Sequence, residues 1–239
     1  MSSYLSSSYL FAATSNVALP ANANVSQNIS IKTADGGTQH LSNIPNTSRT
    51  SSTSSTREIR NILLMGDSIS AGYGLHKDES WVSLLQTRLE DNHYSYNVIN
   101  ASLSGDTTGG GIIRIQRALT QHTPSIVIIE LGGNDGLRGF SLKEIRANLA
   151  RMIDLCHQNN HKVLLVGMQL PPNYGIAYTK QFSGIFRTLA TEKKTALVPF
   201  LFNGFADKKE YFQADQIHPN AKAQKLLLDN IWPALQPLL

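Results

Sequence analysis

The chain has 239 residues, of which 41% are hydrophobic, and this is enough apolar material for one domain with a sizeable buried core. The formal charge of +4 comes from scattered lysines and arginines, and the absence of a basic run excludes a nucleic-acid-binding tract. The single cysteine, Cys156, excludes an internal disulfide and a metal site built from cysteines.

The first 57 residues differ in composition from the rest. They end in the run NTSRTSSTSST and contain few large apolar side chains, so we predict that residues 1–57 are a disordered leader or linker. An Ala-x-Ala pattern ending at Ala23 is typical of a signal-peptide cleavage site, but no basic residue precedes Lys32. A cleaved export signal and a cytoplasmic location both stay open. No stretch approaches the roughly 20 apolar residues that an integral membrane helix needs.

Strands and helices alternate from residue 58 onward. Apolar, β-branched runs predict strands at 60–66, 96–102, 125–133, 162–170 and 196–202. Amphipathic patterns predict the helices at 80–92, 107–122, 141–160, 180–194 and 219–235. Ser141 with Glu144 three residues later is typical of a capping box, and Pro219 suits the first position of the last helix.

Near-continuous apolar strands joined by helices indicate an α/β fold with a parallel sheet covered on both faces. In such folds, ligands bind beyond the carboxyl ends of the strands, so the residues that follow each strand are the candidates for a site. Polar, turn-prone stretches stand there: Asp67-Ser68, Gly105-Asp106, Asn134-Asp135 and, near the end of the chain, Asp215 with His218. Their joint occurrence, in order and at strand ends, predicts a site at that edge of the sheet.

These residue types suit nucleophilic catalysis. A serine such as Ser68 needs a base to take its proton, and His218 has a suitable pKa, while Asp215 can orient and stabilise its ring. The backbone N–H groups of Ser68 and Gly105 and the side-chain amide of Asn134 are candidate donors to an oxyanion. We expect Asp67 to shape the turn at Ser68 rather than to take part in the triad.

Simpler explanations exist for each piece. Gly-Asp-Ser alone is a common turn, Asn134-Asp135 can be an Asx turn, and His218 can cap a helix. His157 and His161 have the spacing of a helical metal pair, but a helix end accounts for them better.

Two other function classes remain as alternatives. The acidic strand ends are also typical of a binuclear metallophosphoesterase, although the chain lacks an Asp-x-His near its first strand and paired histidines later. A non-enzymatic flavodoxin-like binding module is the other class, but no P-loop or Gly-x-Gly-x-x-Gly pattern supports nucleotide binding. Gly-x-Ser-x-Gly is absent as well, which excludes an ordinary α/β-hydrolase.

The stretches GDSISAGYG, ASLSGDT, GGNDGLRG and DQIHPN together resemble the four signature blocks of the SGNH (GDSL) hydrolases. The match is closest to the bacterial thioesterase I, arylesterase and lysophospholipase L1 branch, and it covers roughly residues 59–239. The resemblance implies a hydrolase domain at 58–239 with a flavodoxin-like three-layer α/β/α fold and a five-stranded parallel sheet. It also implies a serine esterase that acts through an acyl-enzyme on aryl esters, acyl-CoA thioesters or lysophospholipids, without a cofactor or metal.

By position, the resemblance assigns the nucleophile and the rest of the triad to Ser68, Asp215 and His218. It assigns the oxyanion hole to Ser68, Gly105 and Asn134. The loop GLRGFS matches a segment that lines the acyl groove. The predicted substrate-binding residues are Leu137, Gly139 and Phe140 of this loop, together with Asp67.

The resemblance also bears on partners and location. It implies a small-molecule acyl ester or thioester substrate and contact with lipid substrates, and no nucleic acid. Members of this branch usually carry a cleaved export signal and work in the periplasm, which favours a periplasmic or secreted protein. The long Ser/Thr-rich start of this chain departs from that pattern. Acyl-chain length, natural substrate and oligomeric state stay open.

Overall fold

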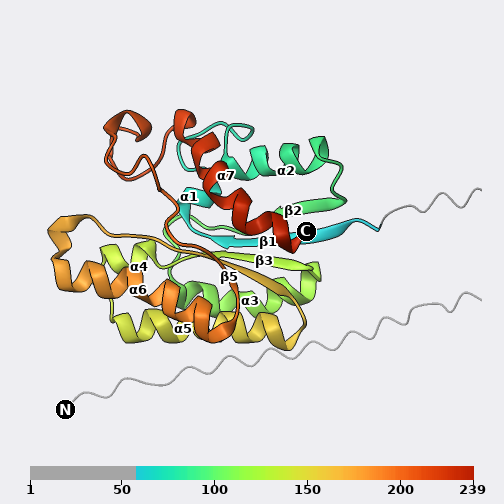
Figure 1. Cartoon of the computed structure of the whole chain (residues 1–239), viewed down its shortest axis with the longest axis horizontal. Helices are drawn as coiled ribbons and strands as arrows, with labels where there is room; N and C mark the ends of the chain where they lie inside the picture. Colours follow the sequence, from blue (N-terminus) through green and yellow to red (C-terminus); the bar gives the residue numbers. More distant parts are fainter. Residues whose placement is uncertain (1–57) are drawn as a thin grey trace, which may run out of the picture. The chain divides into compact units, whose positions relative to one another are not determined.

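A computed structural model describes residues 58–239 of the chain (Figure 1). The predicted disordered leader, residues 1–57, lies outside the described residues. The described part contains one parallel sheet with the strand order β2-β1-β3-β4-β5. The strands are β1 (Arg60–Gly66), β2 (Tyr96–Asn100), β3 (Ile126–Glu130), β4 (Lys162–Val166) and β5 (Ala196–Val198).

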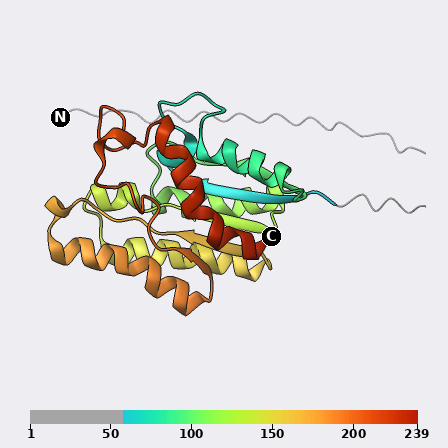
Figure 2. The ribbon, with the colours of Figure 1, turned by 45° about the horizontal axis from the view of Figure 1, so that its top comes forward.

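Helices cover both faces of this sheet. They are α1 (Ser68–Ala71), α2 (Trp81–Asp91), α3 (Thr108–His122), α4 (Gly133–Leu137), α5 (Leu142–Gln158), α6 (Ile176–Lys193) and α7 (Ala221–Leu235). Three 3-10 turns complete the chain: Pro172–Tyr174, Lys209–Tyr211 and Gln236–Leu238. Helices α2 and α7 lie on one face, and α3, α5 and α6 lie on the other, as the two views of the ribbon show (Figures 1 and 2). The predicted three-layer α/β/α fold with five parallel strands is confirmed.

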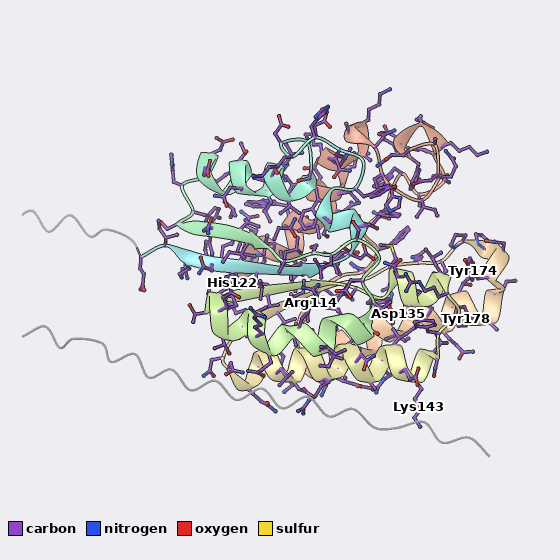
Figure 3. The ribbon with its side chains drawn as sticks, turned by 180° about the vertical axis from the view of Figure 1, so that it is seen from behind. Arg114, His122, Asp135, Lys143, Tyr174 and Tyr178 are labelled. Carbon is purple, nitrogen blue, oxygen red and sulfur yellow. The ribbon has the colours of Figure 1, made fainter. Side chains whose placement is uncertain are left out.

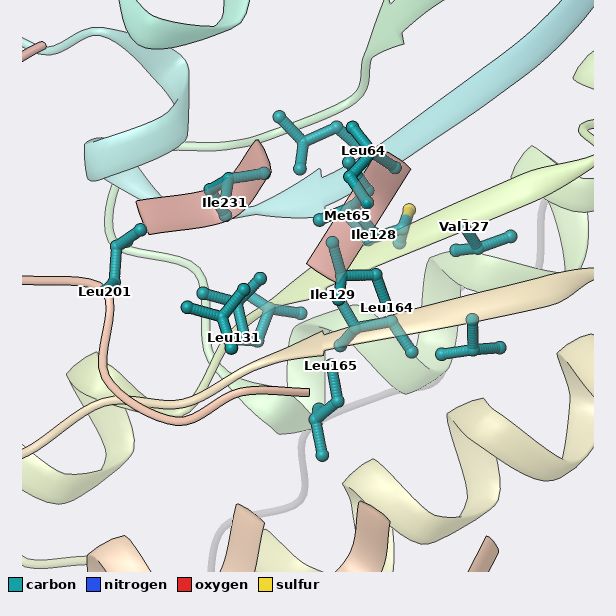
Figure 4. Packing of buried hydrophobic residues seen from close by; sticks show 14 of the residues in the cluster. Leu64, Met65, Val127, Ile128, Ile129, Leu131, Leu164, Leu165, Leu201 and Ile231 are labelled. Atoms are coloured by element: carbon teal, nitrogen blue, oxygen red, sulfur yellow. The ribbon is translucent and has the colours of Figure 1, made fainter. Parts of the chain in front are cut away.

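The three central strands form the middle of the core because their side chains are apolar on both faces. Figure 4 shows their contacts, and the side chains concerned are fully buried: Leu64, Met65, Ile128, Ile129, Leu164 and Leu165. Each such side chain contributes roughly 1.5–3 kcal/mol by leaving water. The strand ends that follow these residues therefore start from a tightly packed base.

The topology opens a crevice at the carboxyl ends of two inner strands of the sheet, β1 and β3. From β1 the chain continues to β2 on one side, whereas β3 pairs with β1 on the other side. The connections diverge at the carboxyl ends of β1 and β3, which is where doubly wound sheets bind ligands. Ser68 follows β1 and Asn134 follows β3, so both stand at this point.

Several local predictions were wrong. The side chain of Ser141 precedes α5 but makes no capping hydrogen bond, so the capping box is not formed. Helix α7 begins at Ala221 with Asn220 as its N-cap, because Pro219 pairs with Phe212 in an isolated antiparallel bridge instead. Strand β5 ends before Pro199, whose missing N–H cannot extend the ladder.

The one-turn helices α1 and α4 were not predicted, because a single turn shows no periodicity in sequence. Among the helices of residues 58–239, none has both the length and the apolarity needed to cross a membrane.

Candidate active site

The serine turn (residues 66–72) connects the buried strand β1 to the crevice. The side chain of Asp67 accepts a hydrogen bond from the backbone N–H of Ile69 at 2.9 Å and so caps the short helix α1. Gly72 ends this helix with φ of +75°, a conformation that glycine adopts without strain. Ser68 is the first residue of α1 and is only 8% exposed. The turn therefore aims the Ser68 side chain from a fixed position.

The histidine loop (residues 213–219) brings the other two predicted triad residues to Ser68. His218 Nε2 lies 2.8 Å from Ser68 Oγ, and His218 Nδ1 lies 2.6 Å from Asp215 Oδ2. Asp215 Oδ1 also accepts hydrogen bonds from the backbone N–H groups of Ile217, at 2.9 Å, and His218, at 3.0 Å. The three side chains form a continuous Ser–His–Asp chain of hydrogen bonds, an arrangement that can activate a serine.

The hydrogen bonds around Asp215 set its charge. Burial acts to raise the pKa of this carboxyl, but the hydrogen bonds from the His218 backbone and ring and from the Ile217 backbone outweigh it and hold the pKa at about 2. Asp215 is therefore ionised at neutral pH. An anion beside Nδ1 favours the tautomer that carries its proton there, which leaves Nε2 free to accept a proton from Ser68.

Two residues that the sequence did not single out hold the histidine loop. The backbone N–H of Gln213 donates to the carbonyl of His218 at 2.8 Å, and its side-chain amide donates to the carbonyl of Tyr73 at 2.7 Å. The Tyr73 ring packs on the His218 ring, with 4.4 Å between centroids. These contacts tie the histidine loop to the segment that follows the serine turn.

Two of the three predicted oxyanion donors are available. Among residues 58–239, neither the backbone N–H of Ser68 nor that of Gly105 has a hydrogen-bond acceptor. Gly105 has φ of +77°, which favours glycine, and its carbonyl accepts a hydrogen bond from Arg138 at 3.2 Å.

The third predicted donor, Asn134, stands at the site but is already engaged. Its side-chain amide donates to Asp67 Oδ2 and to the carbonyl of Asp106, both at 3.0 Å. Donation to an oxyanion therefore requires Asn134 to share or exchange one of these two acceptors.

Asp67 is a buried carboxyl beside the serine, with 3% of its surface exposed. Burial raises its pKa to about 6, against the opposing effect of the hydrogen bonds from Ile69 and Asn134. Its contacts are those of a residue that shapes the turn, as the sequence predicted.

Glu130, at the end of β3, was not predicted as part of the site. It is 2% exposed and accepts a hydrogen bond from Ser70 Oγ at 2.7 Å. Burial, and then the charge of neighbouring Asp67, raise the pKa of Glu130 well above its usual range. The available signal in the sequence was a single acidic residue closing the otherwise apolar run SIVIIE.

The other two carboxylates of the strand ends serve the structure. Asp106 pairs with Arg114 on α3 at 2.7 Å, and Asp135 accepts hydrogen bonds from the backbone and the hydroxyl of Thr108 at the start of the same helix. Figure 3 shows Arg114 about midway along α3, and it labels Asp135, which is on α4. Both acids therefore hold α3 against the loop that carries Gly105 and the short helix α4 that carries Asn134.

A cavity of about 530 Å³ opens beside Ser68. Apolar side chains that follow β4 and β5 line most of it: Met168, Leu170, Pro171, Pro172, Phe200, Phe202 and Phe212. The three phenylalanines pack on one another, with 6.0 Å between the ring centroids of Phe200 and Phe202 and 5.7 Å between those of Phe202 and Phe212. The sequence-based prediction missed this wall, although the Phe-rich stretch after β5 indicated it.

Two of the four predicted substrate-binding residues line this cavity. Asp67 and Leu137 line it, whereas Gly139 and Phe140 do not. The loop that carries them is held by Tyr174, whose hydroxyl donates to the Leu137 carbonyl, and by Tyr178, whose hydroxyl donates to the Phe140 carbonyl, both at 3.0 Å (Figure 3). Contact of Gly139 and Phe140 with a substrate stays a prediction.

His157, near the end of α5, and His161, directly before β4, lie at the amino-terminal end of the sheet, away from Ser68. They line a separate cavity of about 360 Å³ together with Lys162 and Lys194. Within the described part of the chain, no three His, Cys, Asp or Glu side chains gather in a way that could hold a metal ion.

Comparison with known proteins gives the family. Residues 64–226 match the model of the GDSL-like lipase/acylhydrolase family. The chain is 49% identical to esterase TesA of Pseudomonas aeruginosa over 75% of this chain and 90% of that protein. It is 44% identical to an arylesterase of Vibrio mimicus, over 68% of this chain and 82% of that protein. It is 39% identical to thioesterase 1/protease 1/lysophospholipase L1 of Escherichia coli, over 74% and 84%.

Solved structures agree with these relatives. The crystal structure of TesA has a TM-score of 0.74 and 49% identity, and the match covers 75% of this chain and 100% of the TesA chain. The psychrotrophic esterase EstA from Pseudoalteromonas sp., in a structure inhibited by monoethylphosphonate, has a TM-score of 0.71 and 38% identity over 74% and 97% of the two chains. The chain therefore belongs to the GDSL-like lipase/acylhydrolase family, and it is a hydrolase, as the four sequence blocks predict.

Proposed function

We propose that this chain hydrolyses carboxylic esters and thioesters through an acyl-enzyme on Ser68. The observation that carries the proposal is the hydrogen-bonded chain from Ser68 Oγ through His218 to Asp215, at the mouth of an apolar cavity. The names of the relatives, esterase, arylesterase and thioesterase 1/protease 1/lysophospholipase L1, support aryl esters, acyl thioesters and lysophospholipids as substrates.

In the first half-reaction, Ser68 Oγ attacks the carbonyl carbon while His218 Nε2 takes the hydroxyl proton. The Asp215 carboxylate stabilises the imidazolium that results. The carbonyl oxygen becomes an oxyanion and accepts hydrogen bonds from the backbone N–H groups of Ser68 and Gly105, with Asn134 as a third donor. The carbon–oxygen or carbon–sulfur bond to the leaving group then breaks, and His218 returns its proton to the departing alcohol or thiol.

In the second half-reaction, water takes the place of the alcohol. His218 removes a proton from the water, the resulting hydroxide attacks the acyl carbon, and the same donors stabilise the second oxyanion. Ser68 leaves with the proton held by His218, and the carboxylic acid is released. The chain supplies every group that this cycle uses, so the proposal needs no cofactor.

The acyl group lies in the apolar cavity in this proposal. Each methylene that leaves water contributes about 0.8 kcal/mol, so the Phe and Pro walls favour an acyl chain over a polar substituent. The leaving group stays toward solvent, and this arrangement suits a lysophospholipid headgroup as well as an aryl alcohol or a coenzyme A thiol.

A covalent probe tests the proposal directly. A fluorophosphonate should label Ser68, as peptide mass spectrometry will show, and should abolish hydrolysis of p-nitrophenyl esters in step with labelling. Labelling at another residue with loss of activity would contradict the assignment. Loss of activity in EDTA that a divalent ion restores would favour the metallophosphoesterase class. A panel of p-nitrophenyl esters and acyl-CoA thioesters of graded length then measures the substrate preference.

We also propose that the protein is exported to the periplasm or secreted. The support is the Ala-x-Ala pattern that ends at Ala23 and the resemblance to an exported branch of the family. N-terminal sequencing of the native protein tests this: a mature chain that begins at Asn24 agrees with export, and a chain that retains Met1 or Ser2 contradicts it.

A further inference from the structure

The cycle above leaves Glu130 without a role. This acid is buried at the end of β3, and its Oε2 accepts a hydrogen bond from Ser70 Oγ at 2.7 Å. The same oxygen lies 3.4 Å from the backbone nitrogen of Asp67, which donates to it. Glu130 is thus hydrogen-bonded to the serine turn, and its side-chain hydrogen bonds within residues 58–239 are to Asp67 and Ser70 rather than to the triad.

A chain of hydrogen bonds continues from Ser70 to the loop that carries Gly105. The carbonyl of Ser70 accepts a hydrogen bond from the side-chain amide of Asn100 at 2.8 Å, and the Asn100 side-chain oxygen accepts one from the backbone N–H of Ser102 at 3.1 Å. Glu130 on β3, Ser70 on α1 and Asn100 on β2 thereby connect three neighbouring elements of the fold.

The two ends of this chain are the two segments that carry the free backbone donors. Ser68 lies two residues before Ser70 in the same short helix, and Gly105 lies three residues after Ser102 in the same loop. The register between β1 and β2 ends at Leu64 and Asn100, before either donor, and beyond it the backbone N–H of Leu103 donates to the Gly66 carbonyl at 3.1 Å. The distance between the two donors therefore depends on contacts beyond the sheet.

We propose that Glu130, Ser70 and Asn100 form a positioning network that sets the relative placement of the Ser68 and Gly105 backbone N–H groups around the oxyanion. This inference rests on the proposed function, because it presumes that these two groups bind the oxyanion. The three residues act through the backbone and touch no substrate, so they are positioning residues rather than catalytic ones.

Packing around the network leaves little freedom to move. A Cβ on Gly66 would stand 2.8 Å from Ser102 Oγ, 2.8 Å from Ser70 Cβ and 2.9 Å from Glu130 Oε2, which is closer than side chains approach. Burial and the charge of neighbouring Asp67 raise the pKa of Glu130 well above its usual range, and a protonated carboxyl can accept the Ser70 hydrogen bond without placing a second charge beside Asp67. Both features suit an element that must hold one geometry.

The test compares acceptor-removing and acceptor-retaining variants. Glu130→Leu removes the acceptor for Ser70, and Glu130→Gln keeps a neutral side chain with an oxygen in the same place. Asn100→Ala cuts the links to Ser70 and Ser102 at an exposed residue, so it keeps the proposal testable if Glu130→Leu fails to fold. Asn61→Ala is the matched control, because Asn61 donates to the His122 carbonyl from the other end of β1.

We expect Glu130→Leu and Asn100→Ala to lower kcat about 10²-fold, because displacement of a positioned group by about 1 Å costs that much, with KM nearly unchanged. The inhibition constant of an alkylboronic acid, whose adduct with Ser68 mimics the tetrahedral intermediate, should rise in parallel. Glu130→Gln should restore kcat, and Asn61→Ala should lower the unfolding midpoint without a change in kcat.

Folded Glu130→Leu and Asn100→Ala proteins with native kcat would overturn the inference. So would a fall in kcat without a parallel rise in the boronate inhibition constant, or a Glu130→Gln protein as slow as Glu130→Leu. Ser68→Ala in the same series separates this from the proposed function: full activity in Ser68→Ala ends the acyl-enzyme proposal, whereas an inactive Ser68→Ala beside native network variants ends only the inference.

Discussion

The serine turn and the histidine loop meet at one hydrogen bond but come from different surroundings. The serine turn follows a strand whose last five residues are buried, and its Asp67 and Ser68 are 3% and 8% exposed. The histidine loop is a segment between β5 and α7 in which the Asp215 side chain is 37% exposed and that of His218 is 19% exposed. The core therefore fixes the serine, whereas a few hydrogen bonds, including those of Gln213, fix the histidine.

The two aspartates of the site show what this difference does to the same side chain. Asp67 is raised in pKa to about 6 because burial removes it from water. The pKa of Asp215 is lowered to about 2, because the three hydrogen bonds that its carboxylate accepts outweigh the small opposing effect of its partial burial. Asp215 is the carboxylate that hydrogen-bonds to the His218 ring and can stabilise the imidazolium, whereas Asp67 caps α1.

Removal of the serine hydroxyl should have the largest effect. Ser68→Ala should lower kcat about 10⁶-fold, the loss seen when the nucleophile of a serine triad is removed. Steady-state hydrolysis of a p-nitrophenyl ester measures it, and circular dichroism confirms the fold. Ser183→Ala removes a hydroxyl on α6 that does not line the cavity, and this control should keep native kcat. An active Ser68→Ala protein contradicts the triad.

Asp215→Asn tests the exposed partner and should lower kcat about 10⁴-fold. The amide that replaces Asp215 would donate toward His218 Nδ1 and so favour the tautomer that cannot accept the Ser68 proton. The control is Asp91→Asn, an exposed acid at the end of α2 that does not line the cavity and should leave kcat near the native value. A small loss in Asp215→Asn would mean that the histidine loop needs no fixed carboxylate, and the comparison above would fail.

Asn134→Ala asks whether this side chain is a donor to the oxyanion or only a link between loops. As a donor it should lower kcat by about 10²–10³-fold with KM nearly unchanged. Its hydrogen bonds to Asp67 and to the Asp106 carbonyl also predict a loss of about 1 kcal/mol in the free energy of unfolding. Native turnover with a lowered unfolding midpoint would leave the oxyanion to Ser68 and Gly105.

The pH dependence of stability sharpens the contrast between the two carboxyls. Folded Asp67 binds a proton below about pH 6, whereas its usual pKa is 3.8, so its contribution to stability falls as pH rises from about 4 to 6. The difference corresponds to about 3 kcal/mol. The pKa of Glu130 is also raised, by burial and then by the charge of Asp67, so its contribution to stability has the same sign as that of Asp67. Asp215 has the opposite sign: its contribution is present above pH 3.8 and is lost as pH falls toward 2.

Urea unfolding of the native protein and of Asp67→Asn at pH 4, 5, 6 and 7 measures the Asp67 contribution. Asn retains a capping oxygen for Ile69 but cannot ionise, so the decline in the free energy of unfolding between pH 4 and 6 should be shallower in the variant. Parallel curves for the two proteins would show that Asp67 ionises in the folded chain as it does in water.

Sequence patterns predicted most of this architecture, because strand runs and amphipathic helices are decided by local periodicity. They also predicted that Ser68, Asp215 and His218 meet, because motif order and strand ends fix that edge of the sheet. Glu130 was missed because its role depends on Ser70 and Asn100, which are distant in sequence and adjacent only after folding. The aromatic wall was missed for a different reason: its three phenylalanines lie in an irregular segment and show no period.

The smallest expected effect belongs to the removal of residues 1–57. We propose that residues 58–239 form the complete hydrolase domain, because every residue of the site and of the buried core named above lies within them. A protein that begins at Glu58 should therefore keep native kcat and KM toward p-nitrophenyl esters, and its thermal midpoint should match that of the full chain. Ser68→Ala in the shortened protein is the control that the measured hydrolysis comes from the same site. A large fall in kcat or in the thermal midpoint would show that residues 1–57 contribute to the domain, and the domain boundary at residue 58 would be wrong.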